Sequence, residues 1–317
     1  MIEIDHLTKD FGTFRAVDSL SFSVEKGEVL GFLGPNGAGK STSMKMITGY
    51  LSPTSGTARI LGCDVRKDPI SVKNAIGYLP EGAPAWPDMT PVSFLKFIAQ
   101  IRKISGVETD KAIAEVVDKT NLGNVLHQPI QTLSKGFKRR VGLAQALLHD
   151  PEVLIMDEPT DGLDPNQKKD VRDLIQSMSA DKAIIVSTHI LEEVEVICSR
   201  AMIIDTGRIV ADGRPEELEA QSERHNAVRL TVAPEQQENA QKLLEGSEVV
   251  QSVELIGETG LRALSVDRKP ILDPVLACLG KANLKTLEVQ VERGRLDDVF
   301  RNLTKSDIHH FDNREAQ

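Results

Sequence analysis

Short, uninterrupted apolar runs are the most regular feature of the chain. Residues 28–34 (EVLGFLG), 152–158 (EVLIMDE) and 183–189 (AIIVSTH) are apolar segments that end in glycine or in polar residues. Runs of this kind are typical of parallel strands buried on both faces of a sheet. Residues 201–213 (AMIIDTGRIVADG) predict two more strands, joined by a tight turn at Thr206-Gly207. We therefore predict an α/β fold.

The longest helical pattern lies between residues 89 and 149. Apolar residues recur there at three- and four-residue steps, for example at Phe137, Val141, Ala144 and Leu148. Another helix is predicted from Lys40 to about Gly49, directly after a glycine-rich loop. The alternation of strand-like and helix-like runs indicates a mixed sheet with a helical subdomain at about 89–149, all within a domain of residues 1–220.

A second pattern begins after the polar residues 221–226 (QSERHN), which we interpret as a linker. Strand, helix, strand, strand, helix and strand then follow one another, with a short last helix. This βαββαβ order is that of a ferredoxin-like domain, so we predict a small α+β domain over residues 227–304. The polar residues 305–317 are expected to be disordered.

Composition narrows the class of protein. The chain has 317 residues, 40% of them hydrophobic, and 38 Lys and Arg against 47 Asp and Glu, a formal net charge of −9. This acidic balance lacks the basic footprint of nucleic-acid binding, so no nucleic-acid partner is expected. No stretch approaches the roughly 18–20 apolar residues of a membrane span. We expect a soluble chain whose role at a membrane would require a partner.

The glycine-rich segment GPNGAGKS fits G-x-x-x-x-G-K-[ST] completely and lies between a predicted strand and a predicted helix. Its glycines let backbone N–H groups approach phosphates, its lysine reaches the outer phosphates, and its serine can ligate Mg²⁺. We expect the phosphate loop to comprise Gly34, Pro35, Asn36, Gly37, Ala38, Gly39, Lys40, Ser41 and Thr42.

Two carboxylates follow the apolar run at 152–158. Asp157 is placed to hold the metal, and Glu158 is placed to orient or deprotonate a water, a role worth about 10²–10⁴ in rate. His189 follows a neighbouring run, at the strand end where α/β sheets bind ligands, and is expected to contact the γ-phosphate. Two carboxylates with these separate roles favour hydrolysis of the nucleotide over transfer of its phosphate to an organic hydroxyl. The chain has no N-K-x-D motif for guanine, so ATP is the expected nucleotide.

A second helix start with phosphate-binding character lies at residues 133–137 (LSKGF). Ser134 and Gly136 occupy the positions where a helix offers free N–H groups. The chain thus has two helix starts suited to binding phosphate, this one and the phosphate loop, although a single bound nucleotide would require only one.

Taken together, these motifs resemble the nucleotide-binding subunit of an ATP-binding-cassette (ABC) transporter, over residues 1 to about 220. The resemblance implies ATP and Mg²⁺ as cofactors. It also implies that Phe11 stacks on adenine, although the nearby Phe14 is a second candidate and either ring could belong to the core. It further implies that Glu81 senses the nucleotide and reaches the metal, and that Asp164 belongs to the site.

Two departures from the family pattern concern these motifs. Lys135 and Phe137 replace the second glycine and the glutamine of the family signature LSGGQ, whereas Ser134 and Gly136 are retained. Glu81 stands where the family more often has glutamine, which adds a charge. Lys135 could either add positive charge near the phosphate or simply be solvated.

The resemblance also explains the second helix start. In the family two cassettes pack head to tail, so Ser134 and Gly136 would contact the γ-phosphate held at Lys40 of a second copy or of a paralogous cassette. The implied partner is a separate transmembrane permease, with the protein peripheral on the cytoplasmic face of the membrane. With YLPE, LSKG and a C-terminal extension that ends near Asp298-Val299-Phe300, the chain resembles the single-cassette bacterial exporter branch that includes drug-resistance and gliding-motility cassettes. The alternative is a soluble ABC ATPase that acts on nucleic acid or ribosomes.

Overall fold

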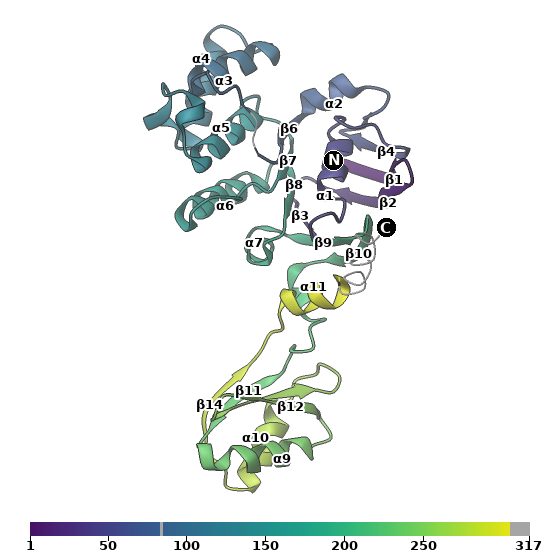
Figure 1. Ribbon diagram of the computed structural model, residues 1–317, viewed down its shortest axis with the longest axis vertical. Coiled ribbons are helices and arrows are strands. Elements are labelled where there is room, and N and C mark those ends of the chain that lie inside the picture. Colours follow the sequence, from purple (N-terminus) through teal and green to yellow (C-terminus); the bar gives the residue numbers. More distant parts are fainter. Residues whose placement is uncertain (83–84, 305–317) are drawn as a thin grey trace, which may run out of the picture. The chain divides into compact units, whose positions relative to one another are not determined.

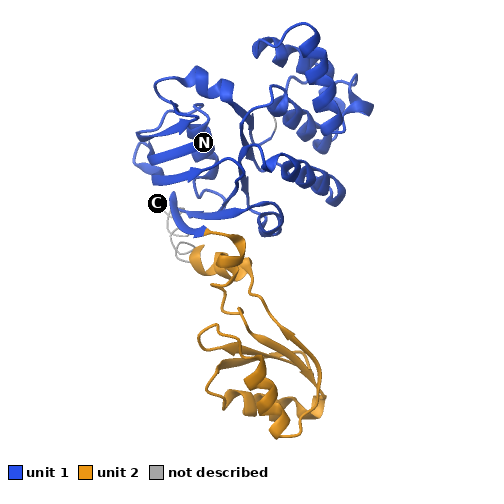
Figure 2. Ribbon diagram, turned by 180° about the vertical axis from the view of Figure 1, so that it is seen from behind, with its two compact units in different colours: residues 1–212 blue, residues 213–317 orange. Residues whose placement is uncertain are grey.

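The computed structural model describes residues 1–82 and 85–304 (Figure 1). The segment 305–317, for which disorder was expected, lies outside the described residues. The chain divides into two compact units, residues 1–212 and residues from Gly213 onward (Figure 2).

A six-stranded sheet forms the centre of the first unit. Its order is β10-β9-β3-β8-β7-β6, and β9, β3, β8, β7 and β6 pair in parallel. The strands are β3 (Val29–Leu33), β6 (Ile76–Leu79), β7 (Val153–Asp157), β8 (Ala183–Thr188), β9 (Arg200–Asp205) and β10 (Arg208–Gly213). Every residue of β3, β7 and β8 is buried. The prediction of a buried parallel sheet is therefore confirmed.

A second, four-stranded sheet covers one side of the first unit and was not predicted from the pattern. Its order is β2-β1-β4-β5, with antiparallel pairing throughout. The strands are β1 (Ile2–Phe11), β2 (Phe14–Val24), β4 (Ser55–Ile60) and β5 (Cys63–Asp64). Side chains of β1 such as Leu7 join one core with Met44 of α1 (Lys40–Ile47) and Ile155 of β7. The glycine-rich loop thus leads into a helix enclosed between two sheets.

Helices gather in the middle of the first unit's sequence, as the pattern predicted. They are α3 (Pro91–Ile101), α4 (Val107–Lys119) and α5 (Lys135–Leu147), with short 3₁₀ turns at Gly123–Val125 and Ile130–Thr132. The other helices of this unit are α2 (Pro69–Ala75), α6 (Pro165–Ser179) and α7 (Leu191–Ile197). Among the described residues, no helix is both long enough and apolar enough to cross a bilayer.

The second unit contains a four-stranded antiparallel sheet in the order β12-β13-β11-β14. Two helices connect its strands, giving the βαββαβ order expected for a ferredoxin-like domain. The elements are β11 (Val228–Val232), α9 (Gln237–Glu245), β12 (Val250–Ile256), β13 (Gly260–Ser265), α10 (Leu272–Lys281) and β14 (Thr286–Val291). Its core packs alternate sheet residues such as Leu230 and Leu261 against Leu244 and Leu279 of the helices.

The polar residues 221–226 are not a free linker. Ser222 is fully buried and its hydroxyl donates to Asp298 Oδ2 at 3.1 Å, while Asn226 Nδ2 donates to the carbonyl of Arg268 at 2.6 Å. These bonds tie the segment to the second unit, which also includes α8 (Pro215–Glu219) and α11 (Leu296–Thr304). The second unit accordingly starts at Gly213, earlier than the expected boundary at residue 220, because α8 packs against α11.

Candidate nucleotide-binding site

The phosphate loop joins the end of β3 to the start of α1. Gly39 precedes the helix with φ of 101°, and a Cβ at this position would lie 2.5 Å from the carbonyl oxygen of Ala16. At Gly34 a Cβ would lie 2.4 Å from the carbonyl oxygen of Ile204. Only glycine fits either position. The first turn of α1 offers N–H groups without helical acceptors, as an anion-binding helix start requires.

Lys40 is directed into this loop. Its ammonium donates to the carbonyl oxygens of Gly34 at 2.7 Å and Pro35 at 3.0 Å, and the residue is 6% exposed. Burial lowers the pKa of Lys40, and the charges of Glu158, Asp157 and Glu81 oppose that shift. The structure therefore brings three predicted carboxylates close enough to act on the lysine of the phosphate loop.

Asp157 ends β7 as a buried carboxylate that is 1% exposed. Its Oδ1 accepts a hydrogen bond from the hydroxyl of Ser187 on the adjacent strand β8. Its Oδ2 is buried and has no hydrogen-bond partner among the described residues. A buried, unpaired carboxylate oxygen is costly unless a cation meets it, so the donor set fits a hard metal ion such as Mg²⁺.

Glu158 follows in a left-handed conformation, with φ of 50°. Its N–H donates to Ser187, both to the carbonyl at 3.0 Å and to the hydroxyl at 3.2 Å. Its Oε1 lies 3.0 Å from Nδ1 of His189, which follows β8 directly. Non-glycine residues with positive φ are held by their surroundings and are common at functional sites. The structure thus pairs Glu158, the predicted base, with His189, the residue expected to contact the γ-phosphate.

A buried carboxylate that the sequence reasoning missed links the segments after these two strands. Glu193 is 2% exposed and accepts hydrogen bonds from the hydroxyls of Thr160 and Thr188, the latter at 3.0 Å. Ser187 was missed as well. The available signal was the polar pair Ser187-Thr188 at the end of an otherwise apolar run, because a buried hydroxyl needs a partner.

Ser134 and Gly136 lie at the start of α5. The Ser134 hydroxyl accepts from the N–H of Phe137 at 3.3 Å and caps the helix. A Cβ at Gly136 would lie 2.2 Å from Oε1 of Gln167 on α6, whose N–H is in turn capped by Asp164 at 2.9 Å. The structure therefore groups Ser134, Gly136 and Asp164. Among the described residues, no hydrogen bond or ion pair joins Ser134 to the phosphate loop.

Two further candidates lie at the surface. Phe11 and Phe14 are 50% and 56% exposed on the hairpin between β1 and β2, so the alternative that either ring belongs to the core is wrong. The ammonium of Lys9 lies 5.2 Å from the centre of the Phe11 ring. Glu81 is exposed, two residues after β6. The adenine contact of Phe11 and the sensing role of Glu81 stay predictions.

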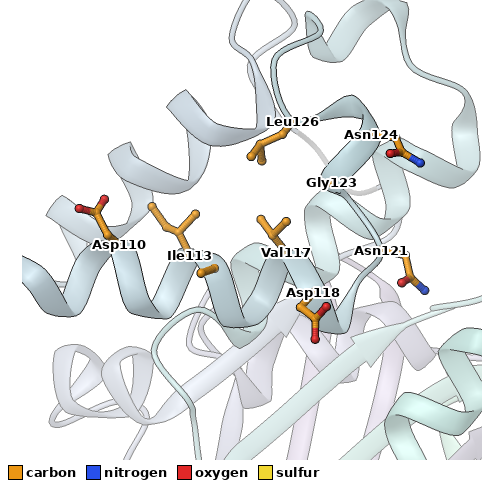
Figure 3. Close-up of a pocket in the computed structure, with 9 residues that line it drawn as sticks. Asp110, Ile113, Val117, Asp118, Asn121, Gly123, Asn124 and Leu126 are labelled. Atoms are coloured by element: carbon orange, nitrogen blue, oxygen red, sulfur yellow. The ribbon is translucent and has the colours of Figure 1, made fainter.

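An open pocket of about 610 Å³ lies elsewhere in the first unit (Figure 3). Ile113 and Val117 of α4 and Leu126 point into it, and Asp110, Asp118 and Asn124 line its rim (Figure 3). All of its lining residues come from α4 and the turn that follows. It is a feature of the helical subdomain and separate from the phosphate loop.

Comparisons with known proteins show the family of this chain. A family model described as ABC transporter matches residues 17–161. The linearmycin resistance ATP-binding protein LnrL of Bacillus subtilis is 31% identical over 305 residues, which cover 96% of this chain and 98% of LnrL. The uncharacterized ABC transporter ATP-binding protein YxlF of the same organism is 38% identical over 232 residues, covering 73% and 77%. This chain belongs to the ABC transporter ATP-binding proteins.

Other relatives of this ABC protein match a smaller share of the chain than LnrL does. The probable multidrug ABC transporter ATP-binding protein YbhF of Escherichia coli (strain K12) is 36% identical over 223 residues, or 70% of this chain. The chain spans only 38% of the length of that relative. Among solved structures, an ATP-binding subunit of an ABC transporter is 28% identical with a TM-score of 0.65, covering 70% of this chain and 92% of that one.

Proposed function

We propose that this ABC protein hydrolyses ATP to power a membrane exporter, from the cytoplasmic face of the membrane. The observation that carries the proposal is the arrangement at the carboxyl ends of β7 and β8. The Glu158–His189 pair lies there, with an Asp157 oxygen that is buried and has no hydrogen-bond partner among the described residues. In the sheet, β8 lies between β7 and β3, the strand that leads into the phosphate loop. This is the edge of a parallel sheet where ligands bind.

ATP would be bound by the N–H groups at the start of α1 and by Lys40, which exchanges its carbonyl acceptors for phosphate oxygens. Asp157 and the hydroxyl of Ser41 would hold Mg²⁺. Glu81 would lie near this ion, since its charge, like that of Asp157, acts on Lys40. When bound, Mg²⁺ neutralises charge on the outer phosphate oxygens.

Hydrolysis would then depend on Glu158. Its carboxylate would accept a proton from the attacking water, and His189 would hold Oε1 through the 3.0 Å contact and face the γ-phosphate. The left-handed backbone of Glu158 is fixed from β8 by two hydrogen bonds to Ser187. The base is therefore positioned by β8, the strand that directly precedes His189.

The proposed working form is a head-to-tail dimer of two cassettes. Ser134 is exposed at its helix start, and its group includes Asp164, the cap of α6. Such a helix start, presented to a second chain, would complete the pocket around the γ-phosphate held at that chain's Lys40. Two-fold symmetry would then create two equal composite pockets, with either a second copy or a paralogous cassette as partner.

A separate permease would dock on the first unit. Trp86 is 53% exposed although its ring packs against Phe97 at 4.9 Å, and Tyr50 and Ile101 are 77% and 59% exposed. Tyr50, Ile98 and Ile101 also line a pocket of about 580 Å³. Exposed apolar groups around a hollow suit a protein partner. The names of LnrL and YbhF, which concern linearmycin resistance and multidrug transport, support export.

The test is Glu158→Gln, with Glu192→Gln, at an exposed position of α7, as the matched loss of a carboxylate. We expect Glu158→Gln to bind ATP but to hydrolyse it at least about 10² times more slowly, and to accumulate an ATP-dependent dimer. Glu192→Gln should behave like the wild type in both assays. Near-normal turnover by Glu158→Gln would remove Glu158 from the role of base.

A further inference from the structure

A buried arginine on α5 makes contacts that the hydrolysis scheme above does not use. Arg139 is 6% exposed and lies in the second turn of the helix that Ser134 caps. Its neighbour Arg140 forms an ion pair with Asp170 at 3.0 Å. The guanidinium of Arg139 instead donates to backbone carbonyl oxygens: Nε to Pro159 at 3.3 Å, Nη1 to Pro80 at 2.9 Å, and Nη2 to Asp157 and Glu158.

These four carbonyls belong to two loops of the nucleotide site. Three of them, those of Asp157, Glu158 and Pro159, are consecutive and form the main chain of the acid segment at the end of β7. The fourth immediately precedes Glu81, at the end of the adjacent strand β6. All three nitrogens of one planar side chain are engaged, and the rigid fork of arginine holds several acceptors in fixed relative positions. Arg139 therefore fixes the distance between α5, the Glu158 backbone and the Glu81 loop.

The hydrogen bond from Arg139 to the Glu158 carbonyl helps to hold Glu158 in an unfavourable backbone conformation. Its φ of 50° is unfavourable for a side chain with a Cβ, so contacts on both sides must hold it. From the N–H side the contacts come from Ser187. From the carbonyl side they come from Arg139. Burial lowers the pKa of Arg139, and the charges of Asp157, Asp161, Glu158 and Glu81 oppose that shift. A guanidinium keeps its charge in proteins, so Arg139 is a cation beside these acids.

We propose that Arg139 is a positioning residue for ATP hydrolysis, which transmits the placement of the Ser134 helix to the base Glu158 and to the Glu81 loop. The inference rests on the proposed function. In a head-to-tail dimer, the start of α5 would contact the nucleotide bound by the partner. Through Arg139, α5 would position Glu158, which acts on the nucleotide bound by the same chain as α5. One side chain would thus connect the two half-sites of a single cassette.

The experiment compares Arg139→Gln and Arg139→Lys with Arg102→Gln in the full chain. Arg102 on the α3 C-terminus is a matched control, because it too is partly buried and donates to backbone carbonyls, those of Lys73 at 2.6 Å and Ile76 at 3.3 Å. The contacts of Arg102 reach the start of β6, not its end. Removing either arginine leaves carbonyls unpaired, so both glutamine variants should lose thermal stability.

Only the Arg139 variants should lose turnover. We expect kcat of Arg139→Gln to fall about 10- to 100-fold with KM for ATP within about twofold, because a base displaced by about 1 Å loses rate without losing ATP affinity. Arg139→Lys should lie between this variant and the wild type, because an ammonium reaches fewer of the four carbonyls. Arg102→Gln should keep its kcat. Equal kcat losses in Arg139→Gln and Arg102→Gln would overturn the proposal.

A double-mutant cycle with Glu158→Gln identifies the residue through which Arg139 acts. If Arg139 positions Glu158, the effect of Arg139→Gln on kcat should shrink to less than about threefold once Glu158 is already neutral. Fully additive losses would overturn the proposal. Should Arg139→Gln not fold, the same cycle with Arg139→Lys decides the question. A wild-type chain without ATPase activity would instead refute the proposed function itself, so the two failures are distinguishable.

Discussion

Ser187→Ala removes a hydroxyl that the structure makes central to the acid segment. This hydroxyl donates to Asp157 Oδ1 and accepts from the N–H of Glu158 at 3.2 Å, and the residue is fully buried. Because Asp157 Oδ2 already has no partner among the described residues, the substitution leaves both oxygens of a buried carboxylate without a side-chain donor. The folded protein should be destabilised by the loss of a hydrogen bond to a charged group.

The expected magnitude can be separated from that of an ordinary buried serine. A hydrogen bond to a charged group contributes about 1.5–3 kcal/mol, against about 0.5–1.5 kcal/mol for a neutral pair. Ser43 provides the control, because it is equally buried and its hydroxyl donates to the neutral carbonyl of Gly39 at 2.9 Å. We expect Ser187→Ala to lower the free energy of unfolding by about 2 kcal/mol and Ser43→Ala by about 1 kcal/mol or less.

The single tryptophan makes the assay specific to the first unit. Trp86 is the only tryptophan of the chain and its ring packs against Phe94 and Phe97. Its fluorescence during thermal unfolding should therefore report residues 1–212. For a unit of this size, about 2 kcal/mol corresponds to a Tm lower by about 4–8 °C. A Ser187→Ala protein as stable as Ser43→Ala would refute the hydrogen-bond scheme drawn for the acid segment.

Three further predictions follow from the geometry. Gly39→Ala should abolish ATP binding in a fluorescent-nucleotide titration, because the new Cβ would lie 2.5 Å from the carbonyl oxygen of Ala16 and the backbone φ is 101°. Gly62→Ala is the control and should still bind ATP, because Gly62 has a comparable φ of 82° but open space around it. Equal binding by both variants would contradict the close approach. Burial is the main cause that lowers the pKa of His149 to about 4, below the ordinary value of about 6.5, so its neutral form favours the folded state. That stability is fully present above about pH 6.5 and is lost as the pH falls towards 4. The Tm of His149→Leu should therefore fall less steeply than the Tm of the wild type over this pH range. Parallel curves of Tm against pH for the two proteins would refute the role of the imidazole. Finally, a chain that ends at Asp212 should fold and bind ATP, since the second unit has a core of its own; insoluble protein from this truncation alone would indicate a shared core.

The elements that surround the phosphate loop could be predicted because their local signals are strong. The runs of β3, β7 and β8 are continuously apolar, whereas a half-exposed strand would alternate apolar and polar residues. The glycine- and lysine-containing segment after β3 fits the phosphate-loop motif completely. The antiparallel sheet that contains β1 and β2 escaped prediction. Its strands carry mixed exposed and buried positions, with register shifts that break strict alternation, so the pattern of period two is blurred.

The residues that support the site were harder to predict than those that carry its chemistry. Lys40, Asp157, Glu158 and His189 belong to recognisable motifs, whereas Arg139 looks in the sequence like one more surface cation of "FKRR". Its burial depends on four carbonyls contributed by two loops that are distant in sequence. Such a partner set is a property of the tertiary structure, because carbonyl acceptors leave no trace in the residue types.

The most direct test of the account is a mixing experiment with two inactive variants. Lys40→Ala removes the phosphate-loop charge, and Ser134→Arg blocks the helix start of α5 with a bulky cation. In a homodimer of either variant both composite pockets are damaged. In a mixed dimer one pocket receives both lesions and the other is intact, so random exchange makes about half of the dimers mixed and restores about a quarter of all pockets.

ATPase activity should therefore reappear when the two inactive proteins are mixed and allowed to exchange subunits. If two intact pockets are needed for turnover, ATP-dependent mixed dimers should still form, as detected by co-purification through a tag on one variant. If Ser134 served the nucleotide of its own chain, mixing would restore neither activity nor dimers, and the composite pocket would be contradicted.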